Sequence, residues 1–167
     1  MSAAPVGSRF AYSGLGSNLE DPSAQIRRAT WHLERLPDSD VQELSSLYRS
    51  APFGPVAQPD FVNAVAIMET SADGPSLLRA LQGIEDAMGR VRGSERWGPR
   101  VIDLDLLVLG DVQIESEDLV IPHPGIAERN FVLLPLREIA PDLIIPGLGP
   151  VKDIAVDERT PRIERIA

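Results

Sequence analysis

Two aspartates, Asp103 and Asp105, stand two residues apart within an apolar run that continues through Leu109. If this run is a β-strand, side chains at alternate positions share one face of the sheet, roughly 7 Å apart at Cα. Two carboxylates on one face supply the oxygen ligands that hard cations such as Mg²⁺ prefer. Like charges on a buried strand cost stability unless they have partners, so we predict that both aspartates are metal ligands and catalytic residues. The alternative is a solvated strand edge with no chemical role.

The segment immediately before these aspartates is basic, although the chain carries a formal net charge of −9. Residues 90–100 contain one acid, Glu95, and four arginines: Arg90, Arg92, Arg96 and Arg100. Guanidinium groups bind phosphate oxygens through paired hydrogen bonds, and glycines give a loop the freedom to close. We therefore expect Arg90 and Arg92 to act in catalysis after the loop closes over a polyphosphate, with Arg100 as a fixed contact. A solvated basic loop is the alternative.

Composition limits the class of protein to which the chain can belong. The length of 167 residues favours one domain, and the sequence has no cysteine, which excludes disulfides and thiol chemistry. No run approaches the roughly 18 apolar residues of a membrane span, and the first residues lack the basic and apolar regions of a signal peptide. A pI near 4.7 argues against nucleic acid as a partner. We expect a cytoplasmic monomer that binds small molecules, with neither membrane nor nucleic acid as a partner.

Hydrophobic periodicity predicts alternating strands and helices. Strands are expected at residues 10–15, 41–49, 61–70 and 101–109, and residues 112–114 are expected to form a hairpin partner for the last of them. The first strand is expected to end at Gly14 and Gly16. Aspartate and proline favour helix starts at Asp21 and Asp73, and a further helix is expected at residues 132–139.

The order of these elements predicts one α+β domain over residues 1–167. It is that of a ferredoxin-like split β-α-β sandwich, here with an added hairpin and C-terminal helices. The core is expected at residues 9–147. Residues 151–167 are charged and weakly patterned, so we expect a loosely held tail.

The stretch that ends in Gly98-Pro99-Arg100, two further residues and Asp103-Leu104-Asp105 resembles the signature of the 6-hydroxymethyl-7,8-dihydropterin pyrophosphokinase family, enzymes of the folate pathway. The likeness extends from Ala11 to Pro146. It includes Tyr48-Arg49-Ser50, Gln58-Pro59-Asp60-Phe61-Val62-Asn63, Ile121-Pro122-His123-Pro124 and Arg129-Asn130-Phe131. The resemblance implies transfer of pyrophosphate from ATP to the dihydropterin hydroxymethyl group, release of AMP, and two Mg²⁺ ions at the paired aspartates.

The resemblance also implies a pterin site. Phe61 and Phe131 stand at the aromatic positions that stack on the pterin ring, and Asn63 reads its polar edge. Further pterin contacts are expected from Ser50, Ala51, Phe53 and Asp103. Without the family likeness, Asn63 is better explained as a polar residue that satisfies a sheet edge.

The nucleotide contacts implied by the resemblance are Gln82, Glu85, Arg92, Trp97, Arg100, Leu106, His123 and Arg129. Trp97 is explained equally well as an ordinary packed aromatic. For Gln82 and Glu85, the alternative is that they are polar helix residues next to the core. A lone histidine is more often structural, so the phosphate role of His123 rests on the family pattern. His32 matches nothing in the pattern, and we expect it to be structural.

The chain departs from the family pattern at a few positions. Phe61 replaces a frequent tyrosine, which preserves a stacking ring and removes a hydroxyl. Gly93, Asp118 and Pro124 stand where some relatives carry a lysine, an arginine and an aromatic residue. These positions bear on affinity and loop behaviour rather than on the reaction.

Three other functions compete with this interpretation. A ferredoxin-like binding module would hold small molecules without chemistry, and a sugar-nucleotide transferase would also use an Asp-x-Asp metal site. A transferase of that kind needs a glycine-rich strand-to-helix turn, which the sequence lacks. An inactive family member is the third, and the intact acids, Arg92, Arg100 and His123 argue against it.

Overall fold

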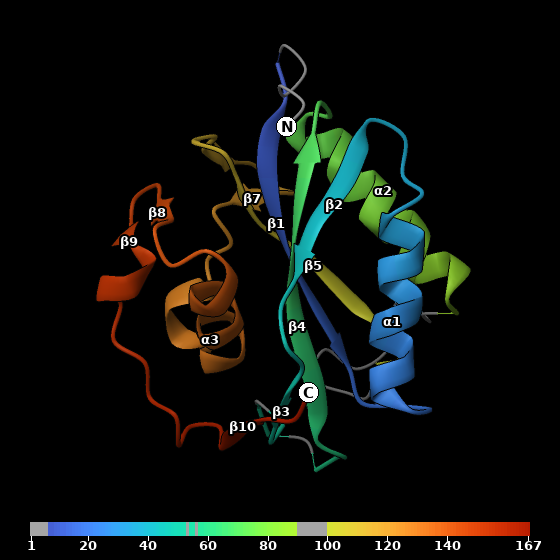
Figure 1. Ribbon diagram of the computed structural model, residues 1–167, viewed down its shortest axis with the longest axis vertical. Coiled ribbons are helices and arrows are strands. Elements are labelled where there is room, and N and C mark those ends of the chain that lie inside the picture. The colour runs from blue at the N-terminus through green and yellow to red at the C-terminus, as the bar shows by residue number, and fades with distance from the viewer. Residues whose placement is uncertain (1–6, 53, 56, 90–99) are drawn as a thin grey trace.

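The computed structural model describes residues 7–52, 54–55, 57–89 and 100–167. Its main feature is a six-stranded antiparallel sheet in the order β10-β3-β4-β1-β5, with β2 also paired to β4 (Figure 1). The strands are β1 (Arg9–Ser17), β2 (Ser39–Leu44), β3 (Tyr48–Ser50), β4 (Phe61–Thr70), β5 (Asp103–Leu109) and β10 (Ile163–Arg165).

Helices cover both faces of this sheet. Helices α1 (Pro22–Leu33) and α2 (Gly74–Ala87) pack on one face, and α3 (Asn130–Ile139) packs on the other (Figure 1). Two separate hydrophobic clusters result: Leu15, Leu104 and Leu106 belong to the α1/α2 side, whereas Val65 and Leu107 belong to the α3 side. The α+β class that the sequence predicts is confirmed.

The two predicted aspartate caps are present at the starts of α1 and α2. The carboxylate of Asp21 accepts a hydrogen bond from the Ala24 N–H at 3.4 Å, and that of Asp73 accepts one from the Ser76 N–H at 2.8 Å. Each cap satisfies a backbone donor that the first helical turn leaves without a partner. Strand β4 also has the predicted bounds.

The predicted strand at residues 41–49 is divided in two. Both β2 and β3 pair with β4, and β2 shifts register between Val41 and Glu43. Between them, the Ser45 hydroxyl accepts a hydrogen bond from the Val65 N–H at 2.9 Å. The side chain therefore replaces a ladder partner at the break. The prediction that Gly14 and Gly16 end the first strand is also wrong, because both lie within β1.

The prediction that residues 112–114 pair with the strand that carries Asp103 and Asp105 is wrong. Strand β6 (Ile114–Glu115) pairs with β7 (Val120–Ile121) rather than with β5. The Val112 N–H donates to the Leu109 carbonyl at 2.9 Å in the turn after β5, and the chain leaves the main sheet there. The 3-10 helix η1 (Ile126–Glu128) then leads into α3, which begins two residues earlier than predicted.

The segment after α3 is attached to the fold, and this includes residues 151–167, which the sequence suggested would be a loosely held tail. It contains β8 (Ile144–Ile145), β9 (Gly149–Pro150) and the 3-10 helix η2 (Val151–Asp153), in which Val151 is fully buried. Strand β10 then pairs with β3 in the main sheet. Charge patterning did not reveal this attachment because it is made largely by backbone groups.

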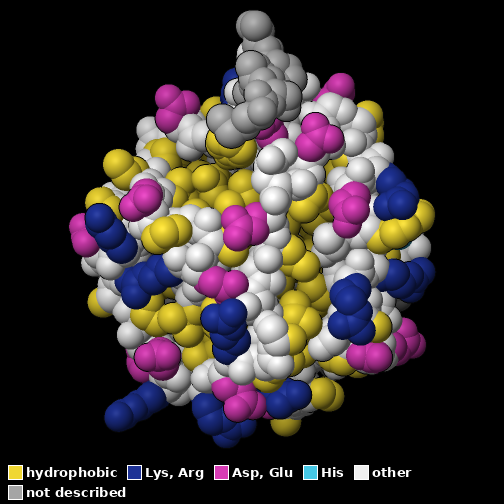
Figure 2. All heavy atoms as spheres, viewed as in Figure 1, with side chains coloured by type: hydrophobic (Ala, Val, Ile, Leu, Met, Phe, Trp, Pro, Cys, Tyr) yellow, Lys and Arg dark blue, Asp and Glu magenta, His cyan; other side chains and the backbone are white. Residues whose placement is uncertain are grey.

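Acidic and basic side chains are interspersed on the face of the molecule shown in Figure 2. Among the described residues, no helix has the length and apolar character needed to cross a bilayer.

Candidate active site

The register of three neighbouring strands assembles the centre of the site. Gly16 of β1 is opposite Asn63 of β4 on one side and Asp103 of β5 on the other. Gly14, two residues away, is opposite Asp105. Directly opposed residues share a face of the sheet, as do alternate residues of one strand. Asn63 and both aspartates therefore lie on the face that α3 covers, with glycines between them.

The absence of a side chain at Gly16 keeps this row open. A Cβ atom placed there would lie 3.1 Å from Asn63 Oδ1, which is closer than ordinary van der Waals contact. Asn63 is buried, and its Nδ2 donates a 2.8 Å hydrogen bond to the hydroxyl of Ser50. This contact assigns the amide nitrogen to the protein and directs the amide oxygen toward Gly16.

A cavity opens above this row between the sheet and the start of α3. The predicted site residues that line it are Ser50, Ala51, Phe61, Asn63, Arg100, Asp103, Asp105, Arg129 and Phe131. The lining residues that the sequence analysis did not assign are Gly14, Leu15, Gly16, Ala64 and Val132. The cavity thus brings aromatic, amide, carboxylate and guanidinium groups together from three separate segments of the chain.

The carboxylates have a basic neighbour across the cavity. A guanidinium nitrogen of Arg129 lies 3.8 Å from a carboxylate oxygen of Asp105, and both side chains are partly buried. The same guanidinium lies 5.9 Å from the centre of the Phe131 ring, within the range of a cation–π contact. Arg129 therefore connects the aromatic wall from α3 to the acidic strand β5.

His123 lies beside Arg129 but outside the cavity lining. Its backbone N–H donates to the Leu107 carbonyl at 2.8 Å, and its imidazole Nδ1 accepts a hydrogen bond from the backbone N–H of Gly125 at 2.9 Å. Burial, followed by the charge of Arg129, lowers the pKa of His123 to about 4 and outweighs the opposing effect of Asp103. At neutral pH the imidazole is therefore uncharged, and the bond to Nδ1 assigns its proton to Nε2.

Gly125 leaves room between these two side chains. A Cβ atom at Gly125 would lie 2.7 Å from Nε of Arg129 and 3.2 Å from Cε1 of His123. The first distance is shorter than real Cβ contacts allow, so a larger residue would displace the guanidinium. Gly125 thereby permits the close approach of two candidate phosphate ligands.

Besides His123, three further predicted nucleotide ligands lie away from the cavity lining. Leu106 is 3% exposed and packs in the core beneath α1 and α2, on the opposite side of the sheet from the aspartates. Glu85 of α2 is 2% exposed, and its carboxylate accepts the Leu104 N–H at 2.9 Å. Gln82 is exposed on α2. The predictions for Phe53, Arg90, Arg92 and Trp97 fall outside the described residues.

Asn18 is a site residue whose role the sequence did not reveal. Its Oδ1 accepts the Arg100 N–H at 2.8 Å, and its own N–H donates to the Arg100 carbonyl at 3.1 Å. Its Nδ2 donates to Gln58 Oε1 at 2.9 Å and to the Pro59 carbonyl at 3.0 Å. Asn18 thus holds Arg100 at the cavity and connects it to the loop before Phe61. An asparagine shortly after the predicted first strand was the available signal, but its partners are distant in sequence.

The fold and the cavity together define an α+β domain with a polar and aromatic cavity between its sheet and helix α3. A family model described as 7,8-dihydro-6-hydroxymethylpterin-pyrophosphokinase (HPPK) matches residues 12–141. The chain therefore belongs to this family and is a pyrophosphokinase of folate biosynthesis, as the resemblance implied. This assignment replaces the binding-module and sugar-nucleotide transferase alternatives.

Individual relatives agree with the family assignment. Proteins named 2-amino-4-hydroxy-6-hydroxymethyldihydropteridine pyrophosphokinase are 47% identical to this chain in Haemophilus influenzae, over 82% of the chain and 85% of the relative, and in Pseudomonas aeruginosa, over 81% and 83%. The solved Plasmodium falciparum HPPK-DHPS protein with pteroate has a TM-score of 0.70 at 15% identity, which shows a shared fold. That likeness covers 88% of this chain, which spans 42% of the Plasmodium chain.

Proposed function

We propose that this chain transfers pyrophosphate from ATP to 6-hydroxymethyl-7,8-dihydropterin with the help of Mg²⁺. In this reaction the hydroxymethyl oxygen bonds to the β-phosphorus of ATP, the bond from that phosphorus to the α-phosphate oxygen breaks, and AMP leaves. The observation that carries the proposal is the shared cavity, in which Phe61, Phe131 and Asn63 stand beside Asp103 and Asp105.

The pterin ring would occupy the end of the cavity near Asn63. Because Asn63 Nδ2 is bonded to Ser50, its Oδ1 remains as an acceptor for a ring N–H. Phe61 begins β4 and Phe131 lies in the first turn of α3, so two different elements supply the aromatic walls. Offset stacking between such rings suits a flat bicyclic heterocycle. The backbone of Ser50 and Ala51 would complete this end, together with the predicted contact from Phe53.

The phosphates would occupy the basic end of the cavity. Arg100 and Arg129 line it, and guanidinium groups match phosphate oxygens in geometry and charge. Uncharged His123 can donate from Nε2 to a phosphate oxygen. We retain Arg90, Arg92 and Trp97 as proposed contacts of the closing loop, and Gln82, Glu85 and Leu106 as proposed residues of the nucleotide side.

Asp103 and Asp105 would hold the metal. Among the described residues, no group of three or more ligating side chains is present, so the protein offers two carboxylates here. This set fits Mg²⁺, which commonly uses one or two carboxylates and completes its coordination with water and substrate phosphates. When bound, the ion would neutralise charge on the phosphate oxygens. The protein side chains orient the two substrates, and no general base is required when positioning and electrostatics supply the acceleration.

The ferredoxin-like description of the fold is part of the proposal. It is supported by the strand order β5-β1-β4-β3 and by the placement of α1 and α2 together on one face of the sheet. We also propose that the chain acts in the cytoplasm, with which the absence of cysteine agrees, and that it acts as a monomer.

A direct assay tests the proposed reaction. The protein is incubated with ATP, Mg²⁺ and 6-hydroxymethyl-7,8-dihydropterin, and the nucleotide products are separated by chromatography. AMP and the pterin diphosphate should accumulate in equal amounts, and omission of Mg²⁺ should stop their formation. Release of ADP would indicate single phosphoryl transfer, and binding without any nucleotide product would indicate an inactive family member.

A further inference from the structure

Residues 157–165, here called the C-terminal strap, pass along one end of the cavity after the family match has ended. The strap includes β10, which lies at the outer edge of the main sheet beside β3 (Figure 1). The strap lines no part of the cavity itself. Its contacts nevertheless reach both walls of the proposed pterin site.

Helix α3 fastens the C-terminal segment through buried and partly buried polar contacts. Asn130 is 3% exposed, and its Nδ2 donates to the carbonyls of Asp157 at 2.7 Å and Pro161 at 2.6 Å. Farther along α3, the Arg137 guanidinium donates to the carbonyls of Val151 and Ile154. Asn130 directly precedes Phe131, so the point of attachment adjoins one aromatic wall.

The other end of the strap is bonded to the wall formed by β3. The Ala51 N–H donates to the Arg162 carbonyl at 2.9 Å, and Ser50 pairs with Ile163 in the β3–β10 ladder. Ser50 also accepts the bond from Asn63 that orients the proposed pterin ligand. A continuous path therefore runs from α3 through the strap to Ser50 and Ala51.

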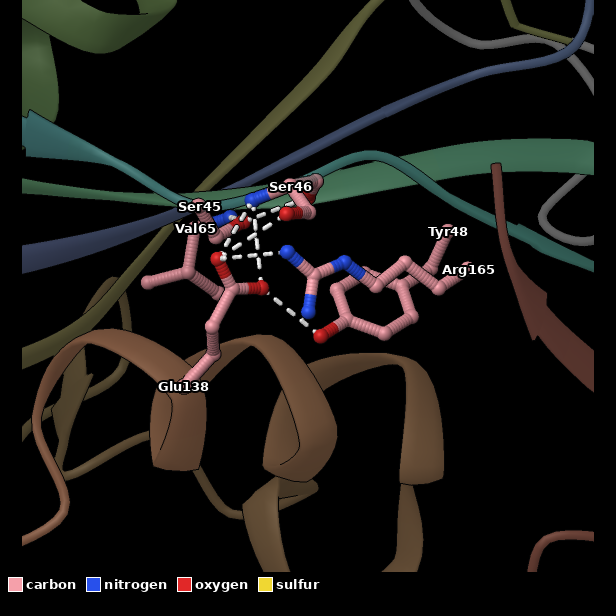
Figure 3. A network of polar contacts seen from close by, with 6 residues as sticks. All are labelled: Ser45, Ser46, Tyr48, Val65, Glu138 and Arg165. Carbon is pink, nitrogen blue, oxygen red and sulfur yellow. Dashed lines mark hydrogen bonds and ion pairs between the residues drawn. The ribbon is translucent and has the colours of Figure 1, made fainter. Parts of the chain in front are cut away.

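A second contact between α3 and this region lies away from the cavity. Figure 3 shows the Glu138 carboxylate of α3 accepting hydrogen bonds from the Tyr48 hydroxyl at 2.7 Å and from the Ser46 N–H at 2.9 Å. It also lies 4.0 Å from the guanidinium of Arg165 in the strap. Helix α3 thus holds β3 at one point through Glu138 and the strap at another through Asn130.

We propose that Asn130 is a positioning residue for pterin binding, because it fastens the strap that fixes Ser50 and Ala51 relative to Phe131. The inference rests on the proposed function of the cavity. Without the amide donor, the carbonyl of Pro161 loses its partner in a buried setting and that of Asp157 in a partly buried one, which favours local opening of the strap. The Ser50–Ala51 wall then loses its outer support, whereas Arg100 is held separately by Asn18.

The test compares Asn130→Leu, which keeps similar volume and removes both donors, with Glu164→Ala. Glu164 lies in β10 within the strap, but its side chain is 65% exposed and pairs with Arg49 away from the cavity. Hydrogen exchange of the Ala51 amide is measured without ligands, and KM is measured for each substrate. Asn130→Leu should raise the Ala51 exchange rate and KM for the pterin about tenfold, with KM for ATP within about twofold of wild type. Glu164→Ala should change none of these values.

Unchanged exchange at Ala51, or an equal rise in both KM values, would overturn the inference. If Asn130→Leu does not fold, Asn130→Ser is measured in the same way, since a single hydroxyl can restore one of the two bonds. Asn130→Ser should give an Ala51 exchange rate between those of wild type and a variant with neither bond. An exchange rate equal to that of wild type would also overturn the inference. If the wild-type protein does not use the pterin, the proposed function fails, while the exchange experiment still decides whether Asn130 holds the strap.

Discussion

The amide nitrogen of Asn63 and the hydroxyl oxygen of Ser50 are 2.8 Å apart and join the strands β4 and β3 at the floor of the cavity. The bond determines which end of the amide a ligand can meet. Because the amide nitrogen of Asn63 donates its hydrogen bond to Ser50, the amide oxygen faces Gly16 and can act as an acceptor. A ligand recognised here must carry a donor, as the ring N–H and amino groups of a pterin do.

Loss of this hydrogen bond should weaken pterin binding selectively. Ser50→Ala removes the acceptor, so the Asn63 amide can rotate and its oxygen is no longer held in place. We expect pterin affinity to fall about fivefold, equivalent to about 1 kcal/mol, with nucleotide affinity unchanged. Calorimetric titration with a pterin analogue and a non-hydrolysable ATP analogue measures both. Arg49→Ala, which alters an exposed residue of the same strand, is the control, and equal weakening of both ligands would contradict the assignment.

Removal of one stacking wall should affect the same ligand more strongly. Phe131→Ala should weaken pterin binding by about 1–3 kcal/mol, the range for stacking of a heterocyclic base on an aromatic side chain. ATP affinity should change little, although Arg129 loses a neighbouring ring at 5.9 Å. The same titrations apply. If neither ligand is affected, Phe131 belongs to the core and not to the binding site.

Neutralising an acid at the proposed metal site should separate turnover from stability. Asp103→Asn should lower kcat by about a hundredfold or more, since loss of an electrostatic contact to the transition state costs several kcal/mol. Stability without ligands should be kept or raised, because one of two neighbouring negative charges on β5 is removed. Asp111→Asn, in the exposed turn after β5, provides the control. Near-normal turnover, or a large loss of stability in urea, would disprove the metal assignment.

The Glu138 network should give a stability contribution that depends on pH. Burial raises the pKa of this carboxyl, but the hydrogen bonds from Tyr48 and Ser46 more than compensate, and the net effect is a pKa below the ordinary value of 4.5. A carboxyl whose pKa is lowered by folding stabilises the protein at any pH above its unfolded-state pKa. That stabilisation is lost as the pH falls through its folded-state pKa. Burial, together with Glu138, raises the pKa of Tyr48 to about 12, so its hydroxyl remains a donor throughout.

Glu138→Gln should therefore lower the urea midpoint most at neutral pH. The difference from wild type should shrink as pH falls below 4.5 and the wild-type carboxyl becomes protonated. Urea denaturation at pH 7 and at successively lower values measures the difference. Glu128→Gln in η1 is a control on an exposed carboxylate. A difference that stays constant with pH would mean that the carboxylate charge has no part in the network.

The sequence was sufficient where local patterns determine structure. A nearly continuous apolar run gave β4, aspartate and proline gave the starts of α1 and α2, and the two-residue spacing along β5 placed Asp103 and Asp105 on one face. The row formed by Asn63, Gly16 and Asp103 was not predictable in this way, because it depends on the register between three strands. The same applies to Asn18 and Asn130, whose hydrogen-bond partners are distant in sequence and are, apart from Gln58, backbone groups. Backbone partners leave no signature in residue type.

The edge position of β5 gives a further meaning to two of its contacts. An exposed edge strand offers unpaired backbone groups to which another chain can add a strand. On β5, the Leu104 N–H is bonded to Glu85 and the Leu107 carbonyl to the His123 N–H. The peptide group that places the His123 imidazole beside Arg129 therefore also occupies a carbonyl of β5 that an added strand would need.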